Sequence, residues 1–376
     1  MQMSGSDLSL YVHIPFCTYK CPYCHFYVVL DKEPLKDLLL SALLKEIVLW
    51  KEAIYGKKLV SVYFGGGTPS LFGAKRIQKL LDAICQVNPI GADCEITLEA
   101  NPENVTVEAM RDFLHAGVNR ISIGVQSFQD SELKILGRKH QSSVAERAIF
   151  ATYEAGFQNI SIDLMYETPT QTLSSWNKSL EKIPTLPLTH LSLYNLTIEP
   201  YTPFAKKESE LRKLMPDEET GGQMYGKAIA DLQSCGFEQY EISAFCKNSL
   251  FSRHNIGYWI GRPFLGLGPS AFSFYETKRF RNVANLTRYA KLVEDGKFAI
   301  DFTEEISPGK RKRELLALHL RLMQGVDLND FGTLEDETVT SIQKLEELEL
   351  LCHKKERLYL SKKGIFFYDH VASELL

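Results

Sequence analysis

The sequence predicts an α/β protein whose parallel sheet forms a barrel or a partial barrel. Short runs rich in β-branched and aromatic residues alternate with amphipathic helical stretches through the first half of the chain. Strands separated by helices usually pair in parallel, so this order favours successive βα units. The predicted strands span 9–14, 59–64, 94–100, 120–125, 159–165 and 190–196. The predicted helices lie near 35–54, 73–87, 106–116, 142–155 and 172–182.

Each predicted strand is an apolar or β-branched run bounded by polar or glycine residues. In chain order the six runs read SLYVHI, LVSVYF, CEITLEA, RISIGV, NISIDLM and HLSLYNL. Beyond them the pattern loosens: residues 206–219 form a charged connector or an exposed helix, and further strand signals occur at 237–243 and 270–276. A chain of 376 residues also exceeds the roughly 250 to 300 residues at which a single core stops growing, so more than one domain is expected.

Three regions are predicted: a barrel core at 1–200, a barrel-closing extension at 201–305 that would also carry a ligand site, and a C-terminal module at 306–376. The last region reads as a helix, a turn, a second helix and a hairpin-like segment at 357–369, which suggests a winged helix. Winged helices often bind DNA, but the second helix carries Glu346, Glu347 and Glu349. A nucleic-acid partner is therefore not expected.

Composition favours a cytoplasmic globular protein. The formal net charge of -4 provides no global positive field that would recruit nucleic acid or an anionic membrane. The first residues show neither a basic segment nor an apolar one of the kind found in secretory signals. The most apolar helical stretch, 35–50, contains four charged residues, which a membrane span of about 20 apolar residues would not tolerate well. No transmembrane segment is expected.

Polar or glycine residues follow successive predicted strands. The second strand leads into GGGTPS at 65–70, the third ends at Glu99, the fourth at Gln126, and the fifth carries Asp163. Each of these could simply start a turn or cap the next helix. In a (β/α) barrel, however, the carboxyl ends of the strands form the active-site face. Their succession therefore favours a functional site there.

Three cysteines carry the strongest chemical signal. Cys17, Cys21 and Cys24 have the spacing C-x3-C-x2-C. In a reducing cytosol such cysteines rarely form disulfides, and zinc sites usually complete a closed shell of four ligands. Three clustered thiolates with no evident fourth favour a [4Fe–4S] cluster that keeps one iron open for an external ligand.

This spacing, with Tyr23 just before the last cysteine, resembles the signature of the radical SAM superfamily. The resemblance implies a partial (β/α)6 TIM-like barrel with a C-terminal α+β extension and a small winged-helix-like module. In that superfamily the open iron binds the amino and carboxylate groups of S-adenosylmethionine (SAM), and the reduced cluster cleaves its sulfonium to a 5′-deoxyadenosyl radical. The glycines at 65–67 would let the backbone approach a ligand closely. In the family, such a segment holds the methionine end of SAM.

Six motifs occur in the order seen in the oxygen-independent coproporphyrinogen III oxidase group: YVHIPFC, GGGTPS, EANP, GVQSF, LGRKH and DLMYETPTQT. The resemblance covers 9–275 and implies two adenosyl-binding positions. Carboxylates suit ribose hydroxyls, and arginine suits a carboxylate. Without the resemblance, the arginine of LGRKH would read as an exposed cation at a helix end. The first position is implied for Tyr11, Gly66 and Glu99, and the second for Tyr23, Gly67, Thr68, Gln126, Arg138 and Asp163.

Two departures from the oxidase pattern favour a related family, the HemW heme chaperones. The oxidase has an extra segment before its cluster and a further cysteine after the triplet, whereas here the first cysteine is residue 17 and Phe26 stands at the later position. The stretch 253–259, RHNIGYW, resembles the HNxxYW motif of HemW, which implies that His254 holds heme. Imidazole is a common heme ligand, and Tyr258 and Trp259 could cover a porphyrin face. Without the resemblance, His254 would read as a structural histidine.

The expected function is therefore that of a chaperone that binds heme and delivers it to hemoproteins, including membrane-associated ones. Its expected cofactors are a [4Fe–4S] cluster and SAM, which in a chaperone would serve a regulatory or structural role. Peripheral contact with the inner membrane face is compatible with the cytoplasmic location. The alternative is an enzyme that decarboxylates two propionates of coproporphyrinogen III. No catalytic residue is assigned, and SAM cleavage is left open. A winged-helix nucleic-acid binder that uses a cluster as a redox sensor is a remote third class.

Overall fold

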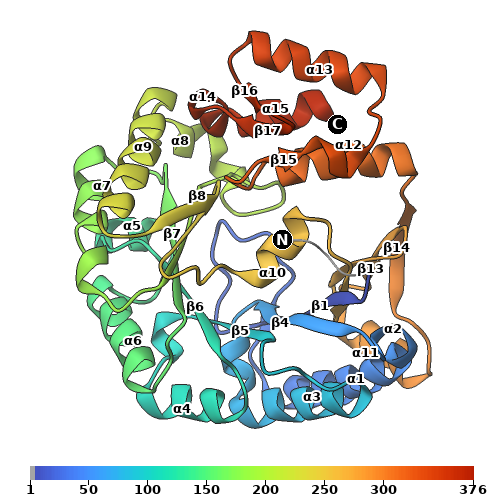
Figure 1. Cartoon of the computed structure of the whole chain (residues 1–376). Helices are drawn as coiled ribbons and strands as arrows, with labels where there is room; N and C mark the ends of the chain where they lie inside the picture. Colours follow the sequence, from blue (N-terminus) through green and yellow to red (C-terminus); the bar gives the residue numbers. More distant parts are fainter. Residues whose placement is uncertain (1–4) are drawn as a thin grey trace.

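The computed structural model describes residues 5–376 as a curved sheet with helices outside it and a small C-terminal module above it (Figure 1). Six central strands pair in parallel, each with the next, as the sequence predicts. They are β1 (Asp7–Ile14), β4 (Lys58–Gly66), β5 (Glu95–Ala100), β6 (Arg120–Gln126), β7 (Ile160–Tyr166) and β8 (His190–Asn195). This arrangement confirms the predicted partial barrel.

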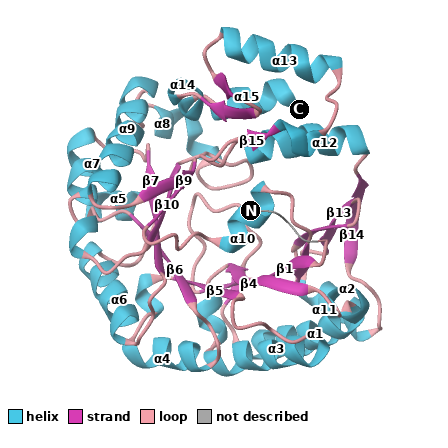
Figure 2. Cartoon of the chain, in the orientation of Figure 1, coloured by secondary structure: helices cyan, strands magenta, loops and turns pink. Residues whose placement is uncertain are grey.

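Most helices of the barrel lie on the outside of the strands (Figure 2). Their apolar faces pack against the outward-facing strand residues in one continuous core, which contains Leu43, Ile84, Ile149 and Trp176. These helices and the short ones beside them are α1 (Glu33–Leu49), α2 (Lys51–Ile54), α3 (Ala74–Val87), α4 (Val107–His115), α5 (Asp130–Ile135), α6 (Ser142–Glu154), α7 (Leu173–Leu180), α8 (Glu208–Arg212) and α9 (Glu218–Ser234).

The extension continues the sheet at both ends, so that twelve strands run from β14 to β9. Beyond β8 lie β10 (Ala244–Cys246), which is antiparallel to β8, and β9 (Glu238–Glu241), which is antiparallel to β10. Beyond β1 the sheet adds one parallel and then three antiparallel strands. These strands and their helices are β11 (Phe264–Leu267), β12 (Phe272–Tyr275), β13 (Lys278–Asn282), β14 (Ile300–Glu305), α10 (Arg253–Trp259) and α11 (Leu286–Glu294).

The C-terminal module has a hydrophobic cluster of its own, centred on Leu316, Leu345, Leu358 and Val371. The hairpin predicted at 357–369 is wrong in its second half. The hydroxyl of Ser361 accepts a hydrogen bond from the backbone N–H of Gly364 at 2.9 Å and so caps the start of a helix. The residues after Ser361 therefore form a helix and not the second strand of a hairpin. The elements are α12 (Pro308–His319), β15 (Val326–Asp327), α13 (Asp336–Glu347), β16 (Leu351–Lys354), β17 (Arg357–Leu360), α14 (Lys362–Phe366) and α15 (Tyr368–Leu375).

A small three-stranded sheet in the order β15-β17-β16 gives the module its wing. The winged-helix-like architecture is thus confirmed, while the three predicted domain boundaries stay predictions. Within residues 5–376, no helix combines the length and the apolar character needed to cross a membrane.

Glu46 joins the extension to the barrel. Its buried carboxylate on α1 accepts hydrogen bonds from the Gly268 N–H at 2.7 Å, the Asn282 amide at 2.7 Å and the Tyr289 hydroxyl at 2.6 Å. Burial raises the pKa of Glu46 to about 7, although these three donors oppose the shift. One side chain thus satisfies donors that come from three separate segments of the extension.

We expect Glu46→Ala to lower the free energy of unfolding by about 3 kcal/mol, because each buried donor that loses its partner costs about 1 to 3 kcal/mol. The measurement is urea unfolding followed by far-UV circular dichroism. Glu52→Ala is the control, because the Glu52 side chain on α2 is 85% exposed. A loss no larger than that of the control would remove Glu46 as the anchor of the extension.

Candidate functional site

The three cysteines lie on one loop at the carboxyl end of β1. Cys17 ends the short strand β2 (Phe16–Cys17), which pairs with β3 (Val29–Leu30), and the loop between these strands carries Cys21 and Cys24. A turn closes within the loop, where the Cys24 N–H donates to the Cys21 carbonyl at 3.1 Å. All three thiols are free and partly exposed. The loop therefore presents three thiols from a short, hydrogen-bonded segment.

The thiols have polar and cationic neighbours. The Cys17 sulfur lies 3.6 Å from the Thr68 hydroxyl, and the Arg138 guanidinium donates to the Cys21 sulfur at 3.7 Å. Burial raises the pKa of the Cys17 thiol to about 11, and the other two cysteines add to the shift. Among residues 5–376, no three Cys, His, Asp or Glu side chains converge closely enough to hold a single metal ion. In a [4Fe–4S] cluster the ligating cysteines do not have to converge on one ion.

We expect Cys17 to react slowly with iodoacetamide at pH 7 to 8 when the cluster is not assembled, because a thiol with a raised pKa holds little thiolate. Reactivity should rise toward pH 11, where the thiol ionises. The exposed Cys85 on α3 is the internal reference. Peptide mass spectrometry after timed alkylation gives both rates. A faster rate at Cys17 than at Cys85 at neutral pH would contradict the raised pKa.

The glycines at the end of β4, Gly66 and Gly67, are required by contacts within the chain. Gly66 has φ +111°, and a Cβ there would overlap the His13 ring. A Cβ on Gly67 would lie 2.7 Å from the Phe16 carbonyl oxygen. Both glycines therefore let β4 approach the segment that leads into the cysteines, and close approach of their backbone to a ligand stays a prediction. Thr68, the next residue, lies beside Cys17, with its hydroxyl 3.6 Å from the sulfur.

Glu99 on β5 connects the glycine segment to an aromatic stack. Its carboxylate accepts from the Tyr63 hydroxyl at 2.8 Å and from the Gly66 N–H at 3.2 Å. The Tyr11 and Tyr63 rings stack with centroids 6.2 Å apart. Burial raises the pKa of Glu99 to about 7, and the nearby Asp163 adds to the shift. Tyr11, Gly66 and Glu99, predicted to share one position, thus lie within one connected network.

Arg138 connects the second predicted set. Its guanidinium donates to the Asn101 side-chain oxygen and to the Gly124 carbonyl, both at 2.7 Å. Asn101 in turn donates to the Thr68 hydroxyl at 2.9 Å. The alternative of an exposed cation at a helix end is therefore wrong, because the guanidinium points into the site. Asn101 was not predicted, although it lies within the EANP motif that ends β5.

The remaining residues of that set lie at the same end of the barrel. Gln126 ends β6 with φ +70°, and it accepts a hydrogen bond from the Tyr194 hydroxyl at 2.7 Å. Asp163 accepts from the Ser122 hydroxyl at 3.4 Å. Tyr23 packs against Phe204 with ring centroids 6.2 Å apart. A positive φ at a non-glycine residue is costly, and such residues cluster at functional sites.

His254 lies on α10, a short helix that Figure 2 shows inside the ring of strands. It is 1% exposed, its Nδ1 is 2.9 Å from the Ser61 hydroxyl, and its Nε2 is 2.8 Å from the Tyr258 hydroxyl. Its ring stacks on Tyr63 with centroids 4.8 Å apart. Burial lowers the pKa of His254 to about 3, and the nearby Arg262 adds to the shift. Heme ligation by His254 stays a prediction, and it requires one of these two hydroxyls to be displaced.

Two further residues belong to this interior and escaped the sequence analysis. Tyr63 links Glu99 to His254, and Arg120 at the start of β6 is 2% exposed with an Nε that has no hydrogen-bond partner. Period-2 alternation along β6 places Arg120, Ser122 and Gln126 on one face. The position of Arg120 on the same face of the predicted strand as Gln126 was the signal that could have identified it as a residue of the barrel interior.

Comparisons with known proteins identify the family of the chain. Residues 11–183 match the family model of the Radical SAM superfamily, and residues 306–367 match the HemN C-terminal domain. The heme chaperone HemW of Bacillus subtilis is 33% identical over 374 residues, which are 98% of this chain and 99% of the relative. The heme chaperone HemW of Escherichia coli is 38% identical over 265 residues, 70% of this chain and 69% of the relative.

A solved structure shows the same fold. Coproporphyrinogen III oxidase (HemN) from Escherichia coli, described as a radical SAM enzyme, superposes with a TM-score of 0.86 and 22% sequence identity. The match covers 98% of this chain and 90% of the oxidase. Identity to HemW proteins is higher and extends over nearly the full chain, and the radical SAM and HemN C-terminal segments occur in the same chain. The chain therefore belongs to the HemW family of heme chaperones within the radical SAM superfamily.

Proposed function

We propose that this protein binds heme and delivers it to hemoproteins, including membrane-associated ones, and that it carries a [4Fe–4S] cluster that binds SAM. The observation that carries the proposal is the full-length relationship to HemW heme chaperones, at 33% identity over 98% of the chain. We further infer a cytoplasmic location with peripheral contact at the inner membrane face, where membrane-associated recipients lie.

The loop with Cys17, Cys21 and Cys24 supports the cluster. Three thiols on one hydrogen-bonded loop, with Arg138 beside the Cys21 sulfur, suit an anionic cluster because the guanidinium opposes the negative charge of the thiolates. Because the loop provides three thiolates, one of the four irons would have no cysteine ligand from it. A reduced cluster held by this loop would supply the electron for any cleavage of the sulfonium of SAM.

The two networks at the strand ends support SAM binding. Tyr11, Gly66 and Glu99 would hold one SAM, with the Glu99 carboxylate accepting from ribose hydroxyls and the Tyr11 ring providing an apolar wall. A second adenosyl-binding position would use the set gathered around Arg138, whose guanidinium suits a carboxylate. That set consists of Tyr23, Gly67, Thr68, Gln126, Arg138 and Asp163.

We expect SAM affinity to rise with pH between 6 and 8. Burial raises the pKa of Glu99 to about 7, so the carboxylate that accepts hydrogen bonds is mostly protonated below that pH and ionised above it. Binding to the ionised form alone would weaken about tenfold from pH 8 to pH 6, one pH unit below the pKa. Equilibrium dialysis of the anaerobically reconstituted protein measures this, with Glu99→Gln as the variant whose profile should be flat. A flat profile for the parent protein would remove Glu99 from the SAM site.

An anaerobic assay distinguishes the chaperone from the alternative, an oxygen-independent coproporphyrinogen III oxidase. Reconstituted protein is incubated with SAM, a reductant and coproporphyrinogen III, and the porphyrin products are separated by chromatography. The proposal predicts no conversion to protoporphyrinogen, in line with Phe26 at the position where the oxidase carries a further cysteine. Robust turnover would contradict the chaperone function.

A further inference from the structure

Helix α10 joins the barrel interior to the C-terminal module, and its two ends are held by different parts of the chain. At its start, the Glu95 carboxylate on β5 accepts from the Arg253 N–H at 2.9 Å and from the His254 N–H at 3.0 Å. At its end, the Trp259 ring meets Arg321 in the segment that follows α12. His254 is therefore fixed to the barrel, whereas the last turn of the helix depends on the module.

Arg321 holds this last turn against the module. Its guanidinium carbon lies 4.3 Å from the centre of the Trp259 ring and 4.9 Å from the centre of the Tyr368 ring on α15, so the cation is close to two aromatic rings. The same guanidinium donates to the Ser243 hydroxyl at 3.1 Å and lies 3.5 Å from the buried Glu241 carboxylate. One side chain thus ties α10, the end of the sheet and the module together.

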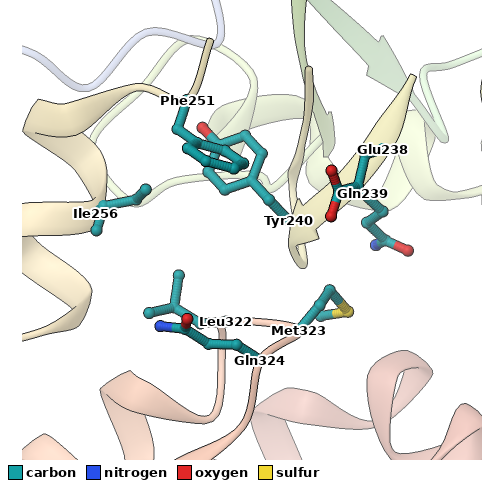
Figure 3. A pocket seen from close by; sticks show the side chains of 8 residues that line it. All are labelled: Glu238, Gln239, Tyr240, Phe251, Ile256, Leu322, Met323 and Gln324. Atoms are coloured by element: carbon teal, nitrogen blue, oxygen red, sulfur yellow. The ribbon is translucent and has the colours of Figure 1, made fainter. Parts of the chain in front are cut away.

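Helix α12 packs against the turn that follows α10. A Cβ on Gly261 would overlap the Leu315 side chain, and the Gly261 carbonyl accepts from the Arg311 guanidinium at 3.2 Å. Arg311 and Leu315 are four residues apart and so lie on one face of α12. A half-open cleft of about 320 Å³ lies between β9 and the segment after α12, and Ile256 and Met323 are among the residues that line it (Figure 3). This free volume beside α10 gives its last turn room to move.

Tyr258, the residue before Trp259, occupies one ring nitrogen of His254. Its hydroxyl lies 2.8 Å from Nε2, and its ring meets the Trp259 ring edge-on with centroids 6.5 Å apart. Tyr258 is half-buried, whereas Ser61, which contacts Nδ1 at 2.9 Å, is fully buried. Nε2 is therefore the nitrogen that heme iron would reach by displacing a single half-buried side chain.

We propose that Arg321 is a positioning residue for heme binding, an inference that rests on the proposed function and deepens it. Trp259 and Tyr258 share the last turn of α10, so fixing the first ring keeps the Tyr258 hydroxyl in place. Because that hydroxyl competes with iron for His254 Nε2, holding it lowers the affinity for heme and releasing it raises the affinity. The module would thus control uptake and release: movement of Arg321 frees the nitrogen, and its return displaces the iron.

The test compares heme with metal-free protoporphyrin IX, because only heme has an iron to bind. Full-length protein is titrated with dithionite-reduced heme and, separately, with protoporphyrin IX, and the Soret absorbance and the quenching of tryptophan fluorescence are followed. The variants are Tyr258→Phe, Arg321→Ala and Arg321→Lys, each in the parent and in a His254→Ala background. Arg313→Ala is the matched control, because Arg313 pairs with Glu335 inside the module at 3.2 Å.

Tyr258→Phe should bind reduced heme about three- to tenfold more tightly than the parent, because the competing hydroxyl is gone. Arg321→Ala should tighten heme binding by about threefold. Arg321→Lys should lie between Arg321→Ala and the parent, since lysine keeps the charge beside Glu241 but has no planar guanidinium to stack. Affinity for protoporphyrin IX should not change, and no gain should remain in the His254→Ala background. Arg313→Ala should match the parent.

The possible failures separate the function from the role of Arg321. If the parent protein binds no heme, the proposed function fails and the inference fails with it. If the parent binds heme, but both Arg321 variants keep its affinity or bind more weakly, the function stands and the role of Arg321 is wrong. A gain that persists in the His254→Ala background, or that is equal for protoporphyrin IX, would also overturn it. Thermal unfolding checks that each variant is folded, and Arg321→Lys decides if Arg321→Ala is not.

Discussion

Replacing Cys17, Cys21 or Cys24 with serine, one at a time, should remove the iron–sulfur cluster. A cluster held by three protein thiolates has none to spare, and a serine hydroxyl rarely replaces a thiolate toward iron. Iron content after anaerobic reconstitution should fall from about four atoms per chain to about one or less. Iron and sulfide analysis, together with the visible charge-transfer absorbance, measures the loss.

Cys85→Ser is the matched control for these substitutions, because Cys85 is exposed on α3 and lies outside the loop. It should keep the iron, the sulfide and the colour of the parent protein. Unchanged iron and sulfide in any one of the three loop variants would show that the cysteine concerned is not a cluster ligand.

Arg138→Ala should weaken SAM binding at least about tenfold. The side chain makes two 2.7 Å hydrogen bonds, to Asn101 and Gly124, and contacts the Cys21 sulfur, so its removal leaves buried acceptors unpaired and takes away the cation of the site. Equilibrium dialysis with reconstituted protein measures the affinity, and iron content shows whether the cluster is retained.

Arg138→Lys helps to separate charge from geometry. A lysine keeps the positive charge but cannot reproduce the planar fork that joins two acceptors, so its affinity should lie between those of the parent and the alanine variant. Arg147→Ala, on the exposed face of α6, is the control and should bind as the parent does. Parent-like SAM affinity in Arg138→Ala would exclude Arg138 from the site.

The barrel was predictable because its signals are local and repeated. The six parallel strands are apolar runs separated by helical stretches, and this order favours parallel pairing. The extension offered weaker signals. β13 (Lys278–Asn282) reads KRFRN and β14 (Ile300–Glu305) reads IDFTEE, and both carry charges on half-exposed faces. They are strands because they pair with one another at the edge of the sheet, which periodicity within each segment does not reveal.

The residues that the structure gathers at the candidate site were predictable, and the contacts that hold them in place were less so. Spacing identified the cysteines, and the ends of the strands indicated Glu99, Gln126 and Asp163. The overlap that a Cβ on Gly66 would make with His13 depends on a contact between β1 and β4, which no single segment encodes. The two hydroxyl contacts of His254 come from positions as distant as Ser61.

The cleft between β9 and the segment after α12 is the feature most distant from the sequence signals (Figure 3). Its floor and wall join Tyr240 on β9 to Leu322 and Met323 after α12, residues that come together only when the C-terminal module packs on the sheet edge. No local pattern marks Met323 as different from other methionines. Only the folded chain shows that its backbone pairs with an edge strand and that it lines an apolar cleft.

Heme transfer tests the central claim most directly. Full-length protein is loaded with heme, freed of excess, and mixed with an apo-hemoprotein such as apomyoglobin, and the Soret spectra of donor and acceptor are resolved over time. The chaperone function predicts that the protein holds heme through gel filtration and then passes it to the acceptor faster than free-heme release allows. A protein that retains no heme, or that transfers none while converting coproporphyrinogen III under reducing conditions, would contradict it.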